Sequence, residues 1–411
     1  MSAPKETTRS FLDILLEGTA EFESPERYYW WSGIAAIAAV VKKNVYLDRG
    51  GSYTLYPNIF VALISKESST TRKGPPITTC KGLLEELGNV RILSGNNSIQ
   101  GIIHDLSMQK TFPSGVVLNE AQGIMISEEF DAFLNDDPKA LSLLTTLYST
   151  HEHGGGYTKT LKNSPVEVLR SPCLSLLVAS NEALFESMVK QKDVIGGFIA
   201  RTLLVHEVET TKINPLTRPP KVKLDRQALI DRLRVISKIR GEFKWTDEAE
   251  DFYINWYHKL RRSKINDRTG SIGRIQDHVL KVAMLVSLAR KEDLDLAVED
   301  LALAIAKCEE CMQAIQIANM GGSQLDAGPG ESLRLVLRAL LDAPNGTLSR
   351  KEILKMFRHK GVDSFMLDRV VETLVQSKSI EQFKSSKNEF SYRATKEELA
   401  KWSQFKREEG G

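Results

Sequence analysis

The sequence predicts an α/β fold built on a parallel sheet, followed by an all-helical segment and a small C-terminal module. Two observations predict it. Apolar runs of strand length alternate with helical patterns through the first half of the chain, and residues 224–318 have helical spacing almost throughout. Strands that alternate with helices are typical of a parallel sheet. A chain of 411 residues has room for about two or three domains.

The first half begins with helices and continues with strands. Residues 8–43 predict two helices, the second starting near Pro25 and centred on the apolar run Gly33–Val41. The run 57–64 is unbroken and apolar, as expected of a strand buried on both faces. Further predicted strands are 90–93, 115–118, 173–179 and 201–205, and the predicted helices between them are 77–87, 99–109 and 127–148.

Breaks in both periodicities suggest the domain boundaries. Asn214–Lys221 reads as one linker and Gly321–Gly330 as another. After the second linker, helices at 331–342, 349–359 and 363–377 precede a β-hairpin, which is the winged-helix plan. The predicted parts are an N-terminal helical segment 1–50, a core 51–212, a helical lid 213–320, a linker 321–330, a winged helix 331–396 and a tail 397–411.

Charge and cysteine content limit the partners and the compartment. The net charge of +2 requires any nucleic-acid surface to be local. The four cysteines form no disulfide framework, and Cys308 and Cys311 lie in a helical pattern without a second pair for zinc, so we expect a cytoplasmic protein and a structural role for this pair. Gly33–Val41 is too short for a membrane span of about 20 residues, and we expect no membrane partner.

The loop after strand 57–64 is the candidate phosphate site. Lys73 stands before a predicted helix, where a P-loop lysine meets phosphates together with backbone N–H groups. Thr71, Arg72 and Gly74 flank it and are further candidates for nucleotide binding. The pattern departs from G-x-x-x-x-G-K-[ST], because Glu67 and Arg72 stand at the glycine positions and Gly74 replaces the metal-binding hydroxyl.

A carboxylate follows the predicted strand 115–118. Glu120 is the candidate general base for the attacking water, and Asn119 is the candidate residue on the metal side, where an aspartate is usual. The alternative is an ordinary acidic residue at a solvated strand end.

Two further polar residues fit the same reaction. Asn181 ends strand 173–179, where it would position the water and the γ-phosphate, although asparagine is also a common turn residue. Arg201 precedes strand 201–205, where it would reach a neighbouring subunit as an arginine finger, and the alternative is a surface salt bridge.

In this order, the motifs resemble a P-loop family of unknown function associated with phage and plasmid primase-helicases. That family also carries a Trp31-Ser-Gly33-like helix and a Pro57-Asn58-like pair before the loop strand. Residues 50–395 are also similar to MCM-type AAA+ replicative helicases, which have a winged helix after the lid. In this resemblance, Leu141–Tyr148 looks like the helix after Walker B, Gly154–Lys162 like the pore hairpin, and Arg274 like the lid arginine that senses nucleotide.

The resemblance implies a P-loop NTPase (AAA+/RecA-like) core that uses ATP and Mg²⁺ and assembles into a homo-oligomeric ring, as a hexamer. Single- or double-stranded DNA is the expected partner. The candidate DNA contacts are Tyr157, Lys159 and Lys162 in the hairpin, Lys355, Arg358 and Lys360 around the second helix of the winged helix, and Lys387 in its wing. For the basic run 258–264 a solvated face is the simpler interpretation.

We therefore expect an ATP-dependent DNA helicase or translocase subunit of a phage or plasmid replication system. Two alternatives stay open. One is a non-hydrolysing initiator or DNA-binding scaffold, which the altered P-loop favours. The other is a clamp-like regulator of a partner helicase.

Overall fold

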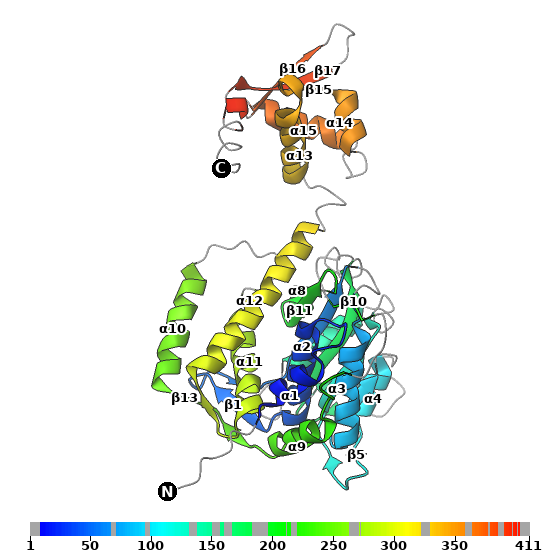
Figure 1. Cartoon of the computed structure of the whole chain (residues 1–411), viewed down its shortest axis with the longest axis vertical. Coiled ribbons are helices and arrows are strands. Elements are labelled where there is room, and N and C mark those ends of the chain that lie inside the picture. Colours follow the sequence, from blue (N-terminus) through cyan, green and yellow to red (C-terminus); the bar gives the residue numbers. More distant parts are fainter. Residues whose placement is uncertain are drawn as a thin grey trace. The chain divides into compact units, whose positions relative to one another are not determined.

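The structure is a computed structural model of the chain (Figure 1). It describes residues 9–66, 71–94, 99–130, 138–149, 157–159, 167–182, 196–210, 212–214, 220–262, 271, 273–321, 329–357, 364–376, 379–384, 390–396, 398–400 and 402. The chain divides into two compact units, residues 1–315 and 316–411. Among the described residues, no helix is long and apolar enough to cross a membrane.

A five-stranded parallel sheet forms the centre of the first unit, which confirms the predicted α/β class. Its strand order is β11-β3-β10-β7-β4. Because β3 is central and covered on both faces, each of its six residues is buried. The strands are β3 (Phe60–Ser65), β4 (Ile92–Ser94), β7 (Gln122–Ser127), β10 (Cys173–Asn181) and β11 (Thr202–Glu207).

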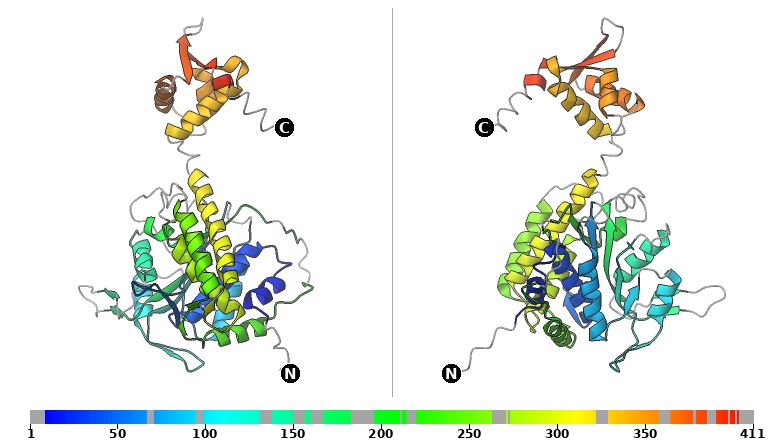
Figure 2. Two further views of the ribbon diagram at one scale, coloured as in Figure 1. Left: turned by 90° about the vertical axis from the view of Figure 1, so that its left-hand side faces the viewer. Right: turned by 45° about the vertical axis from the view of Figure 1, so that its right-hand side comes forward.

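Helices cover both faces of this sheet (Figure 2). On one face, Val61 and Leu63 of β3 share a core with α1 (Phe11–Gly18), α2 (Glu26–Val41) and α3 (Gly74–Leu87). On the other face, the ring of Phe60 packs on Tyr148 of α6 (Pro138–Tyr148) and on Phe198 of α8 (Gly196–Ile199). Helix α4 (Ile99–Ser107) lies between β4 and β7 in the sequence.

Helix α2 is buried along nearly its whole length, as its Ala-rich sequence suggests. It packs on α1, α3, α9 (Arg226–Ile236) and α11 (Ile275–Arg290). Gly33 permits the close approach of α1, because a Cβ at this position would lie 2.8 Å from Leu15 Cδ2. The N-terminal helices, the sheet and the helical segment therefore share one hydrophobic core.

The strand predicted at 115–118 is shorter than expected and lies outside the main sheet. In the structure, β5 (Lys110–Thr111) pairs with β6 (Val117–Leu118) in a short antiparallel hairpin outside the main sheet (Figure 1). Val116 and Val117 are 43% and 46% exposed. The core strand is β7, a few residues later, whose register with β10 pairs Gln122 with Cys173.

The rest of the first unit is mostly helical, as predicted, with short strands that the sequence did not predict. The helices α10 (Asp247–Arg262) and α12 (Val298–Gly321) join α9 and α11. Cys308 and Cys311 are buried in α12. The short strands are β1 (Val45–Asp48), β2 (Thr54–Leu55), β12 (Gly241–Glu242), β13 (Lys244–Trp245) and β14 (Asp295–Leu296), and a separate antiparallel hairpin joins β8 (Tyr157–Lys159) to β9 (Glu167–Leu169).

The second unit contains the three predicted helices and the predicted hairpin. Its elements are α13 (Pro329–Asp342), η2 (Pro344–Gly346), β15 (Thr347–Ser349), α14 (Arg350–Phe357), α15 (Ser364–Gln376), β16 (Ile380–Lys384) and β17 (Phe390–Ala394). The strands form an antiparallel sheet in the order β15-β17-β16. Val336, Leu340, Leu367 and Tyr392 lie in its core. The strand β15 was not predicted.

Candidate functional site

The carboxyl ends of three neighbouring strands form one edge of the main sheet. Ser65, the last residue of β3, is in register with Asn181 of β10 and with Glu207 of β11. In parallel α/β sheets, ligands bind outside the carboxyl ends of the strands. The predicted site residue Asn181 is therefore brought to the strand end from which the candidate phosphate loop departs.

Lys73 lies at this edge, directly before α3. Its side chain is 9% exposed, and Nζ donates a hydrogen bond to Ser65 Oγ. The N-terminus of a helix attracts anions through its free N–H groups and its dipole, and the ammonium adds a full positive charge. Pro75 and Pro76 have no N–H, so the lysine takes a larger share of this attraction than in a glycine-rich loop.

Arg72 adopts a backbone conformation that normally favours glycine. Its φ is +50°, and it occupies one of the positions where the P-loop pattern has glycine. Two contacts from the segment before α2 hold it there: Ser24 Oγ donates to the Arg72 carbonyl at 2.7 Å, and Glu23 pairs with its guanidinium at 3.0 Å. Thr71 is buried, with Oγ1 3.2 Å from the Tyr28 hydroxyl.

A carboxylate that the sequence analysis missed lies against the start of α3. Glu128 follows β7, and its Oε1 accepts a 3.0 Å hydrogen bond from Thr78 Oγ1. A Cβ at Gly74 would be 3.2 Å from Glu128 Oε2, so the glycine makes room for this carboxyl group. Glu129, the next residue, is exposed. The signal was present in the sequence, as an apolar Ile124-Met-Ile run followed by Ser-Glu-Glu.

The structure does not bring Glu120 and Asn119 to this edge. Both are exposed and precede β7 at its amino end, and the adjacent Ala121 carbonyl accepts a 3.1 Å hydrogen bond from the N–H of Cys173, the first residue of β10. The two ends of a six-residue strand are roughly 17 Å apart. The prediction that Glu120 and Asn119 act beside Lys73 is thus corrected, because it depended on the misplaced strand.

Arg201 and Arg274 lie at the amino edge of the sheet. Arg201 precedes β11 and donates to the Gly197 carbonyl at 2.8 Å and to Ser149 Oγ at 3.1 Å. Arg274 precedes α11, and partial burial together with this second guanidinium lowers the pKa of Arg201. The structure therefore groups the two predicted arginines with each other and separates them from Lys73 of the same chain.

Buried polar contacts hold α11 against this amino edge. Lys281 Nζ donates to the Asn58 carbonyl at 2.9 Å and to Asn58 Oδ1 at 2.8 Å, and it lies 3.9 Å from the centre of the Tyr148 ring. Burial lowers the pKa of Lys281 to about 7. His278 Nε2 is 3.0 Å from the Ala200 carbonyl oxygen, and burial lowers the pKa of His278 to about 4. These contacts hold Ala200 and Tyr148 in place, and these two residues precede Arg201 and its partner Ser149 in the chain.

The predicted DNA contacts lie mostly outside the described residues. Tyr157 and Lys159 belong to β8, whose partner strand β9 lies beyond the predicted hairpin 154–162, and Lys355 is exposed on α14. Lys162, Arg358, Lys360 and Lys387 are outside the described part of the chain.

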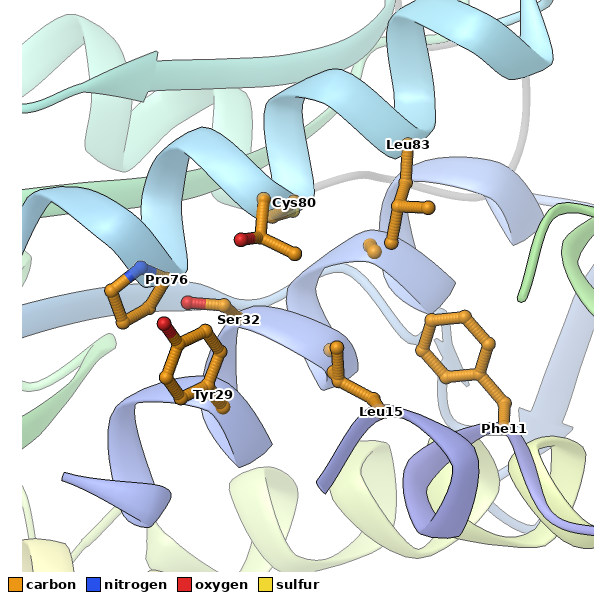
Figure 3. Close-up of a pocket in the computed structure, with 10 residues that line it drawn as sticks. Phe11, Leu15, Tyr29, Ser32, Pro76, Cys80 and Leu83 are labelled. Atoms are coloured by element: carbon orange, nitrogen blue, oxygen red, sulfur yellow. The ribbon is translucent and has the colours of Figure 1, made fainter. Parts of the chain in front are cut away.

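A narrow gap lies between α1, α2 and α3 (Figure 3). It is lined by Phe11, Tyr29, Ser32 and Cys80, and it has no room for a water molecule. We therefore regard it as imperfect packing behind α3.

The carboxyl edge offers two oxygen donors, the Glu128 carboxylate and the Thr78 hydroxyl. The described residues hold no cluster of three or more His, Cys, Asp or Glu side chains for a metal ion. Mg²⁺ that binds together with a phosphate ligand is commonly held by one or two protein carboxylates, and Glu128 is the residue at this edge that could hold it. No protein-family model matches the chain, and no curated protein matches it.

Proposed function

We propose that this chain is an ATP-dependent DNA translocase or helicase subunit that acts as a ring, with a P-loop NTPase core of the AAA+ or RecA-like kind. The supporting observation is the meeting of two polar pairs at the start of α3. The ammonium of Lys73 is paired with Ser65, and the carboxylate of Glu128 is paired with Thr78. A cation and a carboxylate beside one helix N-terminus are what a triphosphate and its Mg²⁺ require.

Each residue at this edge has a role in the proposed reaction. Lys73 binds the phosphates. Glu128 and Thr78 hold the Mg²⁺ side of the nucleotide, and Thr78 supplies the hydroxyl that is absent at position 74. The Mg²⁺ neutralises the phosphate oxygens when bound. Glu129 accepts the proton of the attacking water, and Asn181 orients that water.

The order of strands supports this division of roles. Strand β10 lies between β3 and β7, so Asn181 comes from a strand that adjoins both the Lys73 loop strand and the Glu128 strand. This agrees with the arrangement implied by the resemblance to AAA+ ATPases. Arg201 and Arg274 are placed at the other edge, so a neighbouring subunit is the partner whose nucleotide they reach, which requires a ring or filament.

The distribution of charge supports nucleic-acid binding by the second unit. Residues 331–396 contain 13 Lys and Arg but 8 Asp and Glu, whereas the remaining chain contains 42 Lys and Arg and 45 Asp and Glu. The small net charge of the whole chain therefore hides a basic C-terminal module. A locally basic module is the electrostatic footprint of nucleic-acid binding.

A second candidate function is a nucleotide-insensitive DNA-binding scaffold. The phosphate loop itself favours it. Pro75 and Pro76 remove two N–H donors from the helix start, and Arg72 replaces a loop glycine. Both features weaken the backbone cradle on which P-loop enzymes depend.

ATP hydrolysis by the purified full chain, with and without single-stranded DNA, separates these functions. We expect turnover that DNA stimulates and that Lys73→Ala abolishes. Lys66→Ala is the matched control, because this lysine begins the same loop but is exposed, and it should retain turnover. Equal activity in both variants would disprove the role of Lys73. Absence of turnover in the wild type, with DNA binding intact, would favour the scaffold.

A further inference from the structure

The third helix of the C-terminal unit, α15, has little positive charge for a DNA groove, because its sequence contains one cation, Arg369, and two carboxylates. In helix-turn-helix modules a recognition helix enters the major groove between two rows of phosphates. The exposed surface of α15 includes the carboxylates of Asp368 and Glu372. Asp368 is paired with Arg350, which neutralises it, but Glu372 faces solvent. Phosphates would be repelled from this part of the helix.

The hairpin β16–β17 has the opposite character. Lys384 and Phe390 are directly opposite each other in its register, and Lys384 Nζ lies 5.3 Å from the centre of the Phe390 ring. Phe390 is 43% exposed, although phenylalanine is usually buried. A second such pair, the Arg393 guanidinium 4.9 Å from the Phe383 ring, lies on the opposite face of the hairpin, because Phe383 and Lys384 are consecutive residues of β16. Each face of the wing thus has one cation beside an aromatic ring.

Aromatic rings beside cations are the combination that binds single-stranded nucleic acid. The cation contacts the phosphate backbone, and the ring stacks on a base. A base inside a duplex is already stacked on its neighbours, so an exposed phenylalanine has a free partner only where bases are unpaired. The net positive charge of residues 331–396 favours a polyanion over an uncharged apolar partner.

We infer that the wing, and not the third helix, is the nucleic-acid contact of the second unit. Phe390 stacks on an unpaired base, and Lys384 contacts the adjoining phosphate. This rests on the DNA-binding part of the proposed function and narrows it: the preferred ligand is single-stranded or locally opened DNA. It does not depend on ATP turnover.

Fluorescence anisotropy of the full chain with a single-stranded oligonucleotide and with the matching duplex tests the inference. We expect Phe390→Ala to weaken single-strand binding by about tenfold, the loss of one stacked base. Duplex binding should change by less than about twofold, because the cations remain. Phe390→Trp should retain single-strand binding. Lys384→Ala should reduce the slope of log affinity against log salt by about 0.7.

Two variants on α15 are the matched controls. Val375→Ala truncates an exposed apolar side chain, as Phe390→Ala does, and Glu372→Gln removes the exposed carboxylate. Neither should change single-strand affinity. Tighter duplex binding by Glu372→Gln with no effect of Phe390→Ala would assign the contact to the third helix and overturn the inference. An equal loss of affinity of Phe390→Ala for the single strand and for the duplex would also overturn it. If the wild type lacks ATP turnover but Phe390→Ala still weakens single-strand binding, the proposed ATPase fails and the wing contact stands.

Discussion

The carboxyl and amino edges of the main sheet both hold charged residues, but the hydrogen-bond partners and the burial of these residues differ. At the carboxyl edge, Lys73 and Glu128 are paired with the hydroxyl groups of Ser65 and Thr78. At the amino edge, Lys281 is paired with a backbone carbonyl and an amide oxygen, and burial lowers its pKa to about 7. A hydroxyl is a modest partner that a phosphate or a metal ion replaces readily, because charge-assisted contacts are stronger. The carboxyl edge is thus suited to exchange ligands, and the amino edge to hold its position.

Arg201 belongs to the amino edge but differs from Lys281. Its guanidinium is only partly buried and contacts Gly197 and Ser149. A partly exposed cation next to a rigid network is well placed to meet an anion from outside the chain. In the proposed function, the carboxyl edge therefore acts on the chain's own ligand and the amino edge on the ligand of a neighbouring subunit.

The largest expected effect comes from two variants, each of which inactivates one edge of the sheet, measured separately and then mixed. Arg201→Ala should lower ATP turnover by about 10³- to 10⁵-fold, the range for the loss of an arginine finger, and Lys73→Ala should abolish turnover. Mixed in equal amounts, the two inactive variants should recover activity at about a quarter of the sites, because some neighbours then combine an intact Lys73 with an intact Arg201. Turnover of the mixture is the measurement. If the mixture stays inactive although light scattering shows intact assembly, Arg201 does not complete a site that two subunits share.

A smaller effect is expected from the two ends of β7. Glu129→Gln should lower turnover by about 10²- to 10⁴-fold, the range for loss of a general base. Glu120→Gln makes the same chemical change at the opposite end of the strand and should leave turnover unchanged. Steady-state hydrolysis of both variants is the measurement. The reverse result would restore the original assignment of Glu120.

The smallest effect concerns stability at the amino edge. Burial lowers the pKa of Lys281 to about 7, while the unfolded chain keeps a value near 10.4. Between these values the unfolded chain binds a proton that the folded chain does not, so stability rises with pH by up to about 1.4 kcal/mol per pH unit. Lys281→Met should flatten this rise in urea unfolding between pH 7 and 10. Lys81→Met, at an exposed lysine on α3, should keep the rise of the unfolding free energy with pH. An unchanged rise in both variants would disprove the lowered pKa of Lys281.

Burial on both faces made most of the main sheet predictable. The strands β3 and β10 are mostly apolar and almost wholly buried, which is the pattern of inner strands in a parallel sheet. Strand β7 escaped prediction because Gln122 and Gly123 interrupt its apolar run, while the nearby Val116-Val-Leu118 has a stronger β-propensity. Only long-range pairing decides which of the two enters the sheet. Gly123 itself is required there, because a Cβ would lie 2.5 Å from the Arg91 carbonyl oxygen.

The candidate site was predictable where it depended on a single strand end. Lys73 and Asn181 follow strands that were predicted, and the structure places both at the carboxyl edge. Glu128 could not be assigned without β7, and the amino-edge network could not be found at all. Asn58 and Lys281 are 223 residues apart in sequence, and no local pattern connects them.

The left-handed backbone at Arg72 sets a limit on how far the chain can be shortened. For a residue with a side chain, this conformation costs about 1–2 kcal/mol relative to ordinary helix geometry. Glu23 and Ser24, which hold Arg72 in place, come before α2. A recombinant fragment that begins at Glu26 would keep every helix around the sheet except α1 and would still release the phosphate loop. Protein engineers who trim the N-terminus for crystallisation would thus remove the contacts that support the proposed nucleotide site.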